Sequence, residues 1–200
     1  MKYPIFLCFV ILALFTLISS RKKIDTSNEE FWEKERKANS VRKKPLDTLN
    51  YISIPLEHLP IKKDTTDEAL LEYQEKIIAL SKQKIVNLNG ITNTDLKLQY
   101  GAANITTLMS YDQNFIFLVG ALYKWAVRLH ELGLKEEAKT VLEFGISCRT
   151  DVKGHYVLLA QIYKEDFHPE KINDLIEVAK TLNSIMKNPI ITQLEEIREQ

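Results

Sequence analysis

The pattern of hydrophobic and polar residues predicts a helical body after residue 64. An apolar face recurs at helical spacing over residues 66–82 and predicts a helix there. Its members are Leu70, Tyr73, Ile77 and Leu80. Thr94 and Gly101 predict the start and the end of a short helix. The same pattern predicts helices over residues 103–110, 112–132, 135–147, 152–164, 169–182 and 189–199. Pro169 and Pro189 suit first helical turns, where the missing N–H costs nothing.

The first twenty residues are the most apolar stretch of the chain. Residues 3–20 carry no charged side chain, and a bilayer core of ~30 Å needs about 20 helical residues. The alternative is a cleaved signal peptide, which needs small residues at its cleavage site. Here Arg21, Lys22 and Lys23 follow Ser20 directly. We therefore interpret residues 1–20 as a retained transmembrane signal-anchor.

Basic residues follow this apolar stretch and bear on its orientation. Residues 21–50 contain nine Lys and Arg against six Asp and Glu, whereas only Lys2 precedes the stretch. Because Lys and Arg flanks stay on the cytoplasmic side, the C-terminal body is expected in the cytoplasm. The opposite topology stays open, because exported proteins also begin with a short positive start and an apolar run.

Residues 21–63 are expected to form a charged juxtamembrane stalk and an extended linker. Ser27 and Glu30 have the spacing of a capping box and predict a helix over residues 28–38. Phe31 and Trp32 are its only large apolar side chains. They suit either a membrane interface or a solvated helix surface.

The second part of this region contains two prolines, Pro55 and Pro60, which keep residues 51–60 extended. Ile52, Ile54 and Leu56 lie on this segment. We expect them to be buried along the helical body.

The chain matches itself at a shift of thirty-four residues. Such a period indicates helical repeats, in which stacked hairpins bury a continuous core. The corresponding pairs are Leu122 and Tyr156, Trp125 and Leu159, Ala126 and Ala160, Leu129 and Tyr163, Ala138 and Ile172, Leu142 and Ile176, and Gly145 and Ala179.

This pattern resembles the tetratricopeptide repeat (TPR), a helix–turn–helix of thirty-four residues. The turn from Gly133 to Ala138 matches well, whereas Ile172 stands where the family has a small residue. Leu142 and Ile176 replace the aromatic residue of the second helix. The resemblance implies an all-α fold, in which a TPR-like α-solenoid of helical hairpins follows the N-terminal transmembrane helix.

The resemblance covers about residues 115–183 within a helical domain at 64–200. It implies repeats at about 115–148 and 149–182 and a C-terminal capping helix at 188–199. The whole chain is also similar to membrane-anchored repeat proteins of Gram-positive bacteria whose function is not known. That similarity includes the stretch Asn87–Asn104 and implies no activity.

Charge and motifs exclude several function classes. The net charge is zero, which argues against nucleic-acid binding. The sequence contains no phosphate-binding glycine loop, and no two histidines have metal-ligand spacing. We predict no catalytic residue, no cofactor, no metal ligand and no small-molecule substrate. An enzyme with an unrecognised site around His130, Glu131 and Cys148 is the remaining, disfavoured alternative, and it requires these groups to lie together.

The TPR resemblance instead implies a groove lined by the first helix of each hairpin. Carried over position by position, it assigns Tyr123, Val127 and His130 from one repeat and Val157, Gln161 and Lys164 from the next. Such a mixed surface suits an extended peptide or a partner helix. The alternative is that the preceding helices fill the groove.

We therefore expect a single-pass membrane-anchored scaffold that binds a protein or peptide partner. The alternative is the same fold exported as an envelope assembly or chaperone-like factor.

Overall fold

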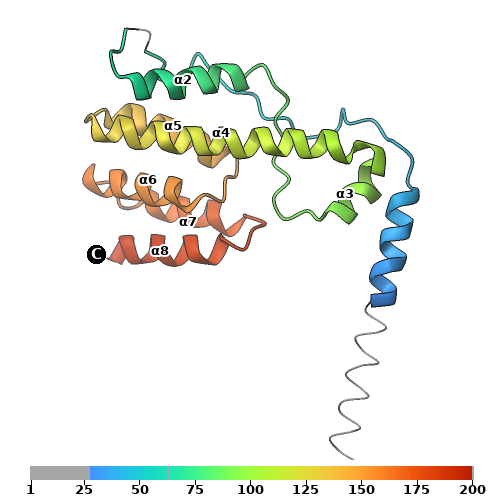
Figure 1. The fold of residues 1–200 in the computed structure, drawn as a ribbon. Helices are drawn as coiled ribbons and strands as arrows, with labels where there is room; N and C mark the ends of the chain where they lie inside the picture. Colours follow the sequence, from blue (N-terminus) through green and yellow to red (C-terminus); the bar gives the residue numbers. More distant parts are fainter. Residues whose placement is uncertain (1–27, 63, 200) are drawn as a thin grey trace, which may run out of the picture. The chain divides into compact units, whose positions relative to one another are not determined.

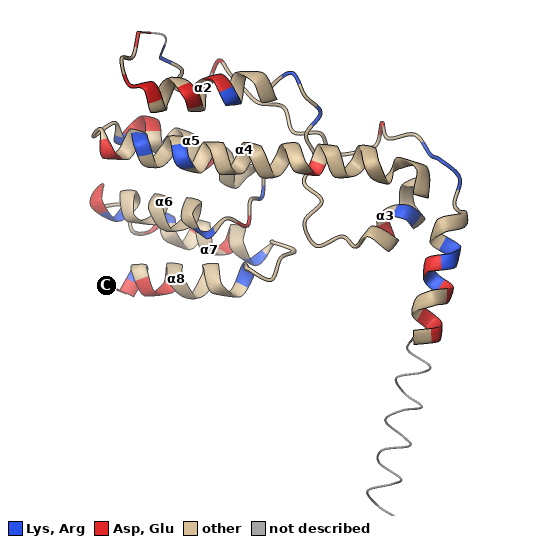
Figure 2. Ribbon diagram, in the orientation of Figure 1, with Lys and Arg blue, Asp and Glu red and all other residues tan. Residues whose placement is uncertain are grey.

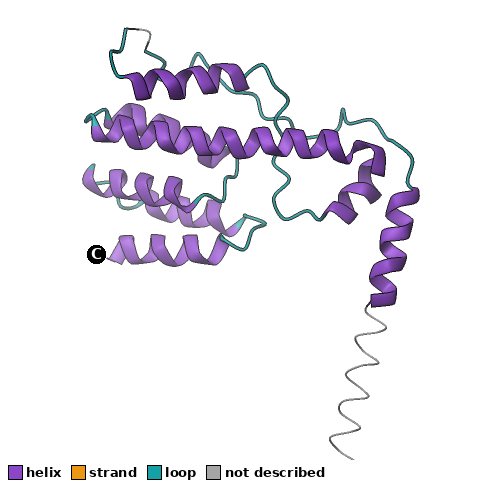
Figure 3. Ribbon diagram, in the orientation of Figure 1, coloured by secondary structure: helices purple, strands orange, loops and turns teal. Residues whose placement is uncertain are grey.

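A computed structural model describes residues 28–62 and 64–199. This part of the chain is all-helical, as predicted, and its only β-structure is an isolated antiparallel bridge between Tyr51 and Val86 (Figure 3). The predicted membrane segment over residues 1–20 lies outside the described residues, as does Ser27 of the capping box. No helix within the described ranges combines the length and apolarity needed to cross a bilayer.

The chain divides into two compact units, which we describe separately. The smaller unit comprises Met1–Leu46 and Thr92–Ile105, and the larger unit comprises Asp47–Ile91 and Thr106–Gln200. Figure 1 labels helices α2 to α8.

The smaller unit pairs a helix at residues 28–40 with α3 (Asn93–Tyr100). The Glu35 carboxylate accepts hydrogen bonds from the Lys97 ammonium and from the Thr94 hydroxyl, the latter at 2.7 Å. Lys34 forms an ion pair with Asp95 at 2.7 Å. These contacts show why the predicted N-cap was wrong: Thr94 bonds to the neighbouring helix, while the Thr92 hydroxyl accepts from the Asp95 N–H and caps α3.

A buried asparagine links separate segments of the smaller unit by hydrogen bonds. Asn104, in the short 3₁₀ helix η1 (Ala102–Asn104), donates to the carbonyls of Lys44 and Tyr100, both at 2.7 Å. Gly101 ends α3, as predicted, with a φ of +90°. A Cβ at Gly101 would lie 2.3 Å from the Arg42 carbonyl oxygen, so only glycine fits there.

The larger unit is built from hairpins of helices. Its elements are α2 (Glu68–Leu80), α4 (Ile105–Glu131, of which Ile105 clusters with the smaller unit), α5 (Lys135–Ser147), α6 (Lys153–Glu165), α7 (Lys171–Lys180) and α8 (Lys187–Glu199). The α5 helix packs against α6, and α8 packs against both α6 and α7 (Figure 1). Trp125 and Tyr156 are the largest fully buried side chains of this core.

The two helices predicted over residues 103–110 and 112–132 are one continuous helix, α4. The predicted break lay between Ser110 and Asp112. The Ser110 hydroxyl instead donates to the Thr107 carbonyl at 2.7 Å, within the helix. The Asp112 carboxylate accepts from the Leu88 N–H at 3.1 Å. Both side chains therefore find partners without interrupting the helix.

The start of α7 also differs from its prediction. Pro169 lies before the helix, which begins at Lys171, and the Pro169 carbonyl accepts from the Ile172 N–H at 3.1 Å. Pro189 does lie in the first turn of α8, as predicted.

The period of thirty-four residues continues into the last helix. The α6 and α8 helices are thirteen residues each, and their first residues, Lys153 and Lys187, have this spacing. Ile190, Leu194 and Ile197 are buried at positions that correspond to Tyr156, Ala160 and Tyr163 of α6. The outward positions of α8 are polar and exposed. They include Asn188, Thr192, Glu195, Glu196 and Glu199.

Residues 47–62 pack on the helices of the larger unit. The Ile52 N–H donates to the Ile85 carbonyl at 2.9 Å. Ile54 and Leu59 are buried, and Ile52 and Leu56 are half-buried against the core. The predicted burial of this segment along the helical body is confirmed.

Candidate partner-binding site

The first three residues of the predicted groove lie on α4 and are half-buried. The Tyr123 ring lies against His155 of α6, with 5.5 Å between ring centroids. Val127 lines a small cleft of about 240 Å³ together with Tyr73 of α2. The Nε2 atom of His130 is buried without a hydrogen-bond partner among the described residues.

The other three residues lie on α6. Val157 is half-buried and packs against the core, whereas Gln161 is exposed. The Lys164 ammonium donates to the Ile197 carbonyl of α8 at 3.4 Å. Lys164 therefore contacts α8, and Val127 shares a cleft with Tyr73 of α2. Of the six residues, only Gln161 is exposed.

A more exposed apolar groove lies between α2 and α4. It has a volume of about 490 Å³. Ile116 and Phe117 of α4 line it and are 51% and 58% exposed. The remaining lining residues are Tyr73, Lys76, Ala79, Leu80, Gly120, Ala121 and Lys124.

The groove was not predicted from the sequence, although the residues of α4 carry a signal for it. Between Ile105 and Tyr123 the only charged residue is Asp112, and Figure 2 shows almost no charge along this stretch. Burial raises the pKa of Asp112, whose carboxylate bonds to Leu88. The solvent-facing positions follow helical spacing and carry no charge. They are Thr106, Met109, Ser110, Gln113, Ile116 and Phe117. Three of them, Met109, Ile116 and Phe117, are apolar and lie outside the face that α4 turns to its own core.

Lysines stand on both walls of this groove. Lys76 of α2 pairs with Glu72 one turn earlier, and this hydrogen bond lowers the pKa of Glu72. Lys124 of α4 is exposed and forms no ion pair with a residue that the structure describes. Gly120 lies on the α4 wall, and a Cβ there would meet no atom within 4 Å.

A second, polar cleft of about 510 Å³ lies where loops meet at the ends of the helices. The Asn87 side chain donates to the carbonyls of Cys148 and Arg149, at 3.1 and 3.0 Å. The Asn183 side chain donates to the Gly90 carbonyl at 3.2 Å. These amides hold the loop of residues 87–91 against the hairpins. Their hydrogen bonds therefore fix the wall of the cleft.

The residues of the enzyme alternative do not come together. Cys148 is buried at the end of α5, and desolvation raises the pKa of its thiol to about 11. His130 and Glu131 lie at the end of α4, before α5 begins. The thirteen residues of α5 span roughly 20 Å. Within the described ranges, no three His, Cys, Asp or Glu residues are grouped as a metal site requires.

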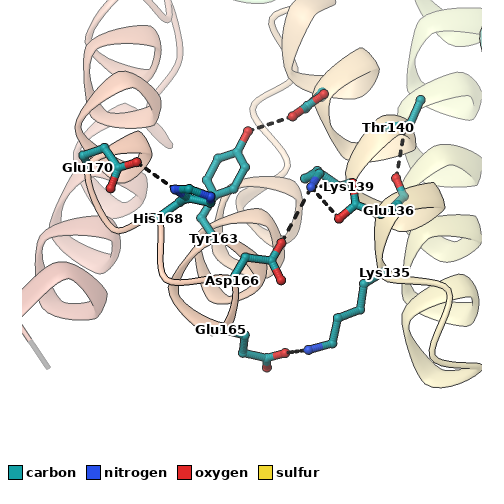
Figure 4. A network of polar contacts seen from close by, with 10 residues as sticks. Lys135, Glu136, Lys139, Thr140, Tyr163, Glu165, Asp166, His168 and Glu170 are labelled. Carbon is teal, nitrogen blue, oxygen red and sulfur yellow. Dashed lines mark hydrogen bonds and ion pairs between the residues drawn. The ribbon is translucent and has the colours of Figure 1, made fainter.

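A network of charged residues joins the start of α5 to the end of α6 (Figure 4). Lys139 lies 2.6 Å from Glu136 and 3.6 Å from Asp166, and Lys135 pairs with Glu165. The Glu136 hydrogen bond raises the pKa of Lys139. Each carboxylate named here has a lysine partner, so the cluster links α5 to the end of α6.

Two further exposed aromatic residues, Phe31 and Trp32, lie in the smaller unit. They are 52% and 58% exposed, and their rings contact edge to face at 5.3 Å.

Comparisons of the chain with family models, curated proteins and solved structures found no match. The α2–α4 groove is therefore the candidate site on its own geometry.

Proposed function

We propose that this chain is a membrane-anchored scaffold of TPR-like helical hairpins that binds a protein partner. The observation that carries the proposal is the α2–α4 groove, in which Ile116 and Phe117 are more than half exposed. Leaving such side chains in water forfeits about 25 cal/mol for each Å² of apolar surface. Exposed apolar patches of this kind mark sites where a partner docks.

The membrane part of the proposal rests on the sequence. Residues 3–20 are uncharged, and basic residues follow them. Phe31 and Trp32 are exposed on the next helical segment, where aromatic side chains suit the bilayer interface. The excess of Lys and Arg in residues 21–50 favours a cytoplasmic body.

The repeat part of the proposal rests on the period of thirty-four residues. The first residues of α6 and α8 are separated by this period, and so are their buried residues. Gly145 of α5 also supports it, because a Cβ there would lie 2.4 Å from the His155 ring of α6. A small residue is what lets stacked helices approach this closely.

Site-specific photo-crosslinking of the full chain in its native membranes tests the binding function. A crosslinking amino acid at Phe117 is expected to capture a discrete partner, and one at Gln161 reports on the groove predicted from the sequence. The exposed position Thr192 of α8 is the control and should capture none. Absence of a discrete product at both Phe117 and Gln161, in a chain that folds normally, contradicts the proposal.

Topology is tested separately, by protease access to a C-terminal tag in cells whose outer wall is removed. A protected tag agrees with the cytoplasmic body that we propose. A digested tag places the body outside and supports the envelope-factor alternative.

A further inference from the structure

We propose that the α2–α4 groove binds an acidic amphipathic helix. This inference rests on the proposed function, because it names the class of partner for the same groove. It follows from the shape of the groove, the absence of charge on its floor and the position of its lysines.

The shape of the groove suits a helix. Two helices, α2 and α4, form its walls, and the α4 residues that line it run from Ile116 to Lys124. At 1.5 Å per residue these residues span roughly 12 Å, about two helical turns. A helix that lies in such a groove presents apolar residues at positions i, i+3, i+4 and i+7.

Gly120 permits close approach to the α4 wall. No atom lies within 4 Å of the place where its Cβ would be, so the gap is neither filled nor closed by the protein itself. Ile116 and Phe117 project beside it from the preceding turn and are 51% and 58% exposed. A side chain of the bound helix can rest above Gly120 while its neighbours contact Ile116 and Phe117.

The charges at the groove select the partner. Lys76 stands on α2 and Lys124 on α4, so a bound helix has an ammonium group on each side. The Lys124 ammonium forms no ion pair with a described residue, although it lies close enough to lower the pKa of Glu72. Carboxylates on both flanks of the bound helix would pair with Lys124 and compete with Glu72 for Lys76. A basic helix would meet two like charges, which disfavours binding.

Two peptides of about 18 residues test the inference. They share one leucine stripe at helical spacing and differ only in the flanks, which are glutamate in one and lysine in the other. Binding of each to the full chain in mild detergent is measured by fluorescence anisotropy. The acidic peptide is expected to bind about tenfold more tightly than the basic one.

Three variants then locate the site. K124E is expected to lower the affinity for the acidic peptide about fivefold or more, and K76E/K124E is expected to reverse the preference. G120L fills the groove and weakens both peptides. K187E, at the start of α8, carries the same charge change outside the groove and should leave binding unchanged. Circular dichroism confirms that each variant retains its helices.

Several outcomes overturn the inference. Equal affinity for the two peptides shows that charge selects nothing, and failure of both to bind shows that no helix docks. Self-association that G120L abolishes identifies a second copy of the chain as the occupant. Each of these leaves the proposed function standing if the crosslinker at Phe117 still captures a partner. Failure of the proposed function and failure of this inference are therefore distinguishable.

Discussion

At the scale of single residues, three helix ends in the larger unit adopt the left-handed backbone that glycine prefers. Gly133 fills one, with a φ of +74°. Arg149 and Phe167 fill the others, with φ values of +57° and +62°. The left-handed conformation costs an L-residue about 1–2 kcal/mol. Phe167 gains no burial in exchange, because it is 89% exposed.

We therefore expect F167G to stabilise the protein by up to about 1 kcal/mol, the relief of backbone strain less the entropy cost of glycine. Thermal unfolding measures the change, and G133A should shift the midpoint in the opposite direction. A lower midpoint for F167G would show that the phenyl ring makes a stabilising contact.

His155 is the second residue whose surroundings predict a measurable effect. Its side chain is fully buried, and neither ring nitrogen has a hydrogen-bond partner among the described residues. Desolvation lowers its pKa to about 4, from an ordinary value of 6.5. The native state therefore holds the imidazole neutral, whereas the unfolded chain protonates it below pH 6.5.

Because the unfolded state binds the proton more tightly, the free energy of unfolding should fall as the pH drops from 6.5 towards 4. Between pH 7.5 and pH 5 the loss is about 2 kcal/mol. Urea unfolding at the two pH values measures it. Acidification also protonates carboxylates such as Glu35, whose pKa is lowered by its Lys97 hydrogen bond. Their contribution to the free energy of unfolding is lost as well. The comparison with H155L isolates the histidine, and an unchanged pH dependence in that variant would refute the assignment.

At the scale of helices, Gly145 sets how closely α5 approaches α6. In an ordinary helix interior, glycine to alanine stabilises by about 1 kcal/mol. At Gly145 the new Cβ would lie 2.4 Å from Cδ2 and 2.5 Å from Nε2 of His155. We expect G145A to destabilise the protein by about 1–3 kcal/mol instead.

Two comparisons check the reason for that loss. G120A adds the same methyl group in open space on α4 and should be neutral or stabilising. H155A removes the opposing ring, so the G145A effect should shrink in the H155A background. If the two substitutions are additive in chemical denaturation, the steric explanation is wrong.

The first turn of α2 offers a test of how helices are joined. Asp67 caps α2 by accepting a hydrogen bond from the Leu70 N–H at 2.9 Å. Its carboxylate also accepts a hydrogen bond from the guanidinium Nε of Arg128 in α4, at 3.0 Å. The Arg128 hydrogen bond lowers the pKa of Asp67. D67N keeps an oxygen for the cap but loses the ion pair, whereas D67A loses both. The melting temperature should therefore fall further for D67A than for D67N, and equal losses would show that the cap contributes nothing.

Sequence patterns predicted most of these helices because local signals control them. Apolar spacing located α2, α5, α6 and α8 to within a few residues. The continuity of α4 was missed because it depends on a distant partner: the Leu88 N–H satisfies Asp112, and no local pattern shows this. The α2–α4 groove was missed for a related reason. Ile116 and Phe117 fit any core-facing pattern, and only packing shows that the core does not use them.

At the scale of the whole molecule, residues 47–62 are part of the core of the larger unit, because Ile54 and Leu59 of this segment are buried in it. A variant chain beginning at residue 47 retains them and should unfold cooperatively on heating. One beginning at residue 64 exposes the core and should lose that cooperativity or aggregate. Circular dichroism melting distinguishes them, and equal melting of both would show that the segment is dispensable.

The outer side of α8 is polar, and this bears on how a stack of hairpins would end. In a helical repeat array, each unit exposes an apolar surface that the next unit covers. The α8 helix has the register of a new unit, since Ile190 and Leu194 occupy the buried positions, but it shows Thr192, Glu195 and Glu196 to solvent. We therefore expect α8 to end the stack of hairpins as a capping helix does. Leu158 and Ile162 of α6 occupy the positions that correspond to Thr192 and Glu196. Replacing these two residues of α8 with Leu and Ile is therefore expected to expose an apolar surface, on which a further appended hairpin would pack.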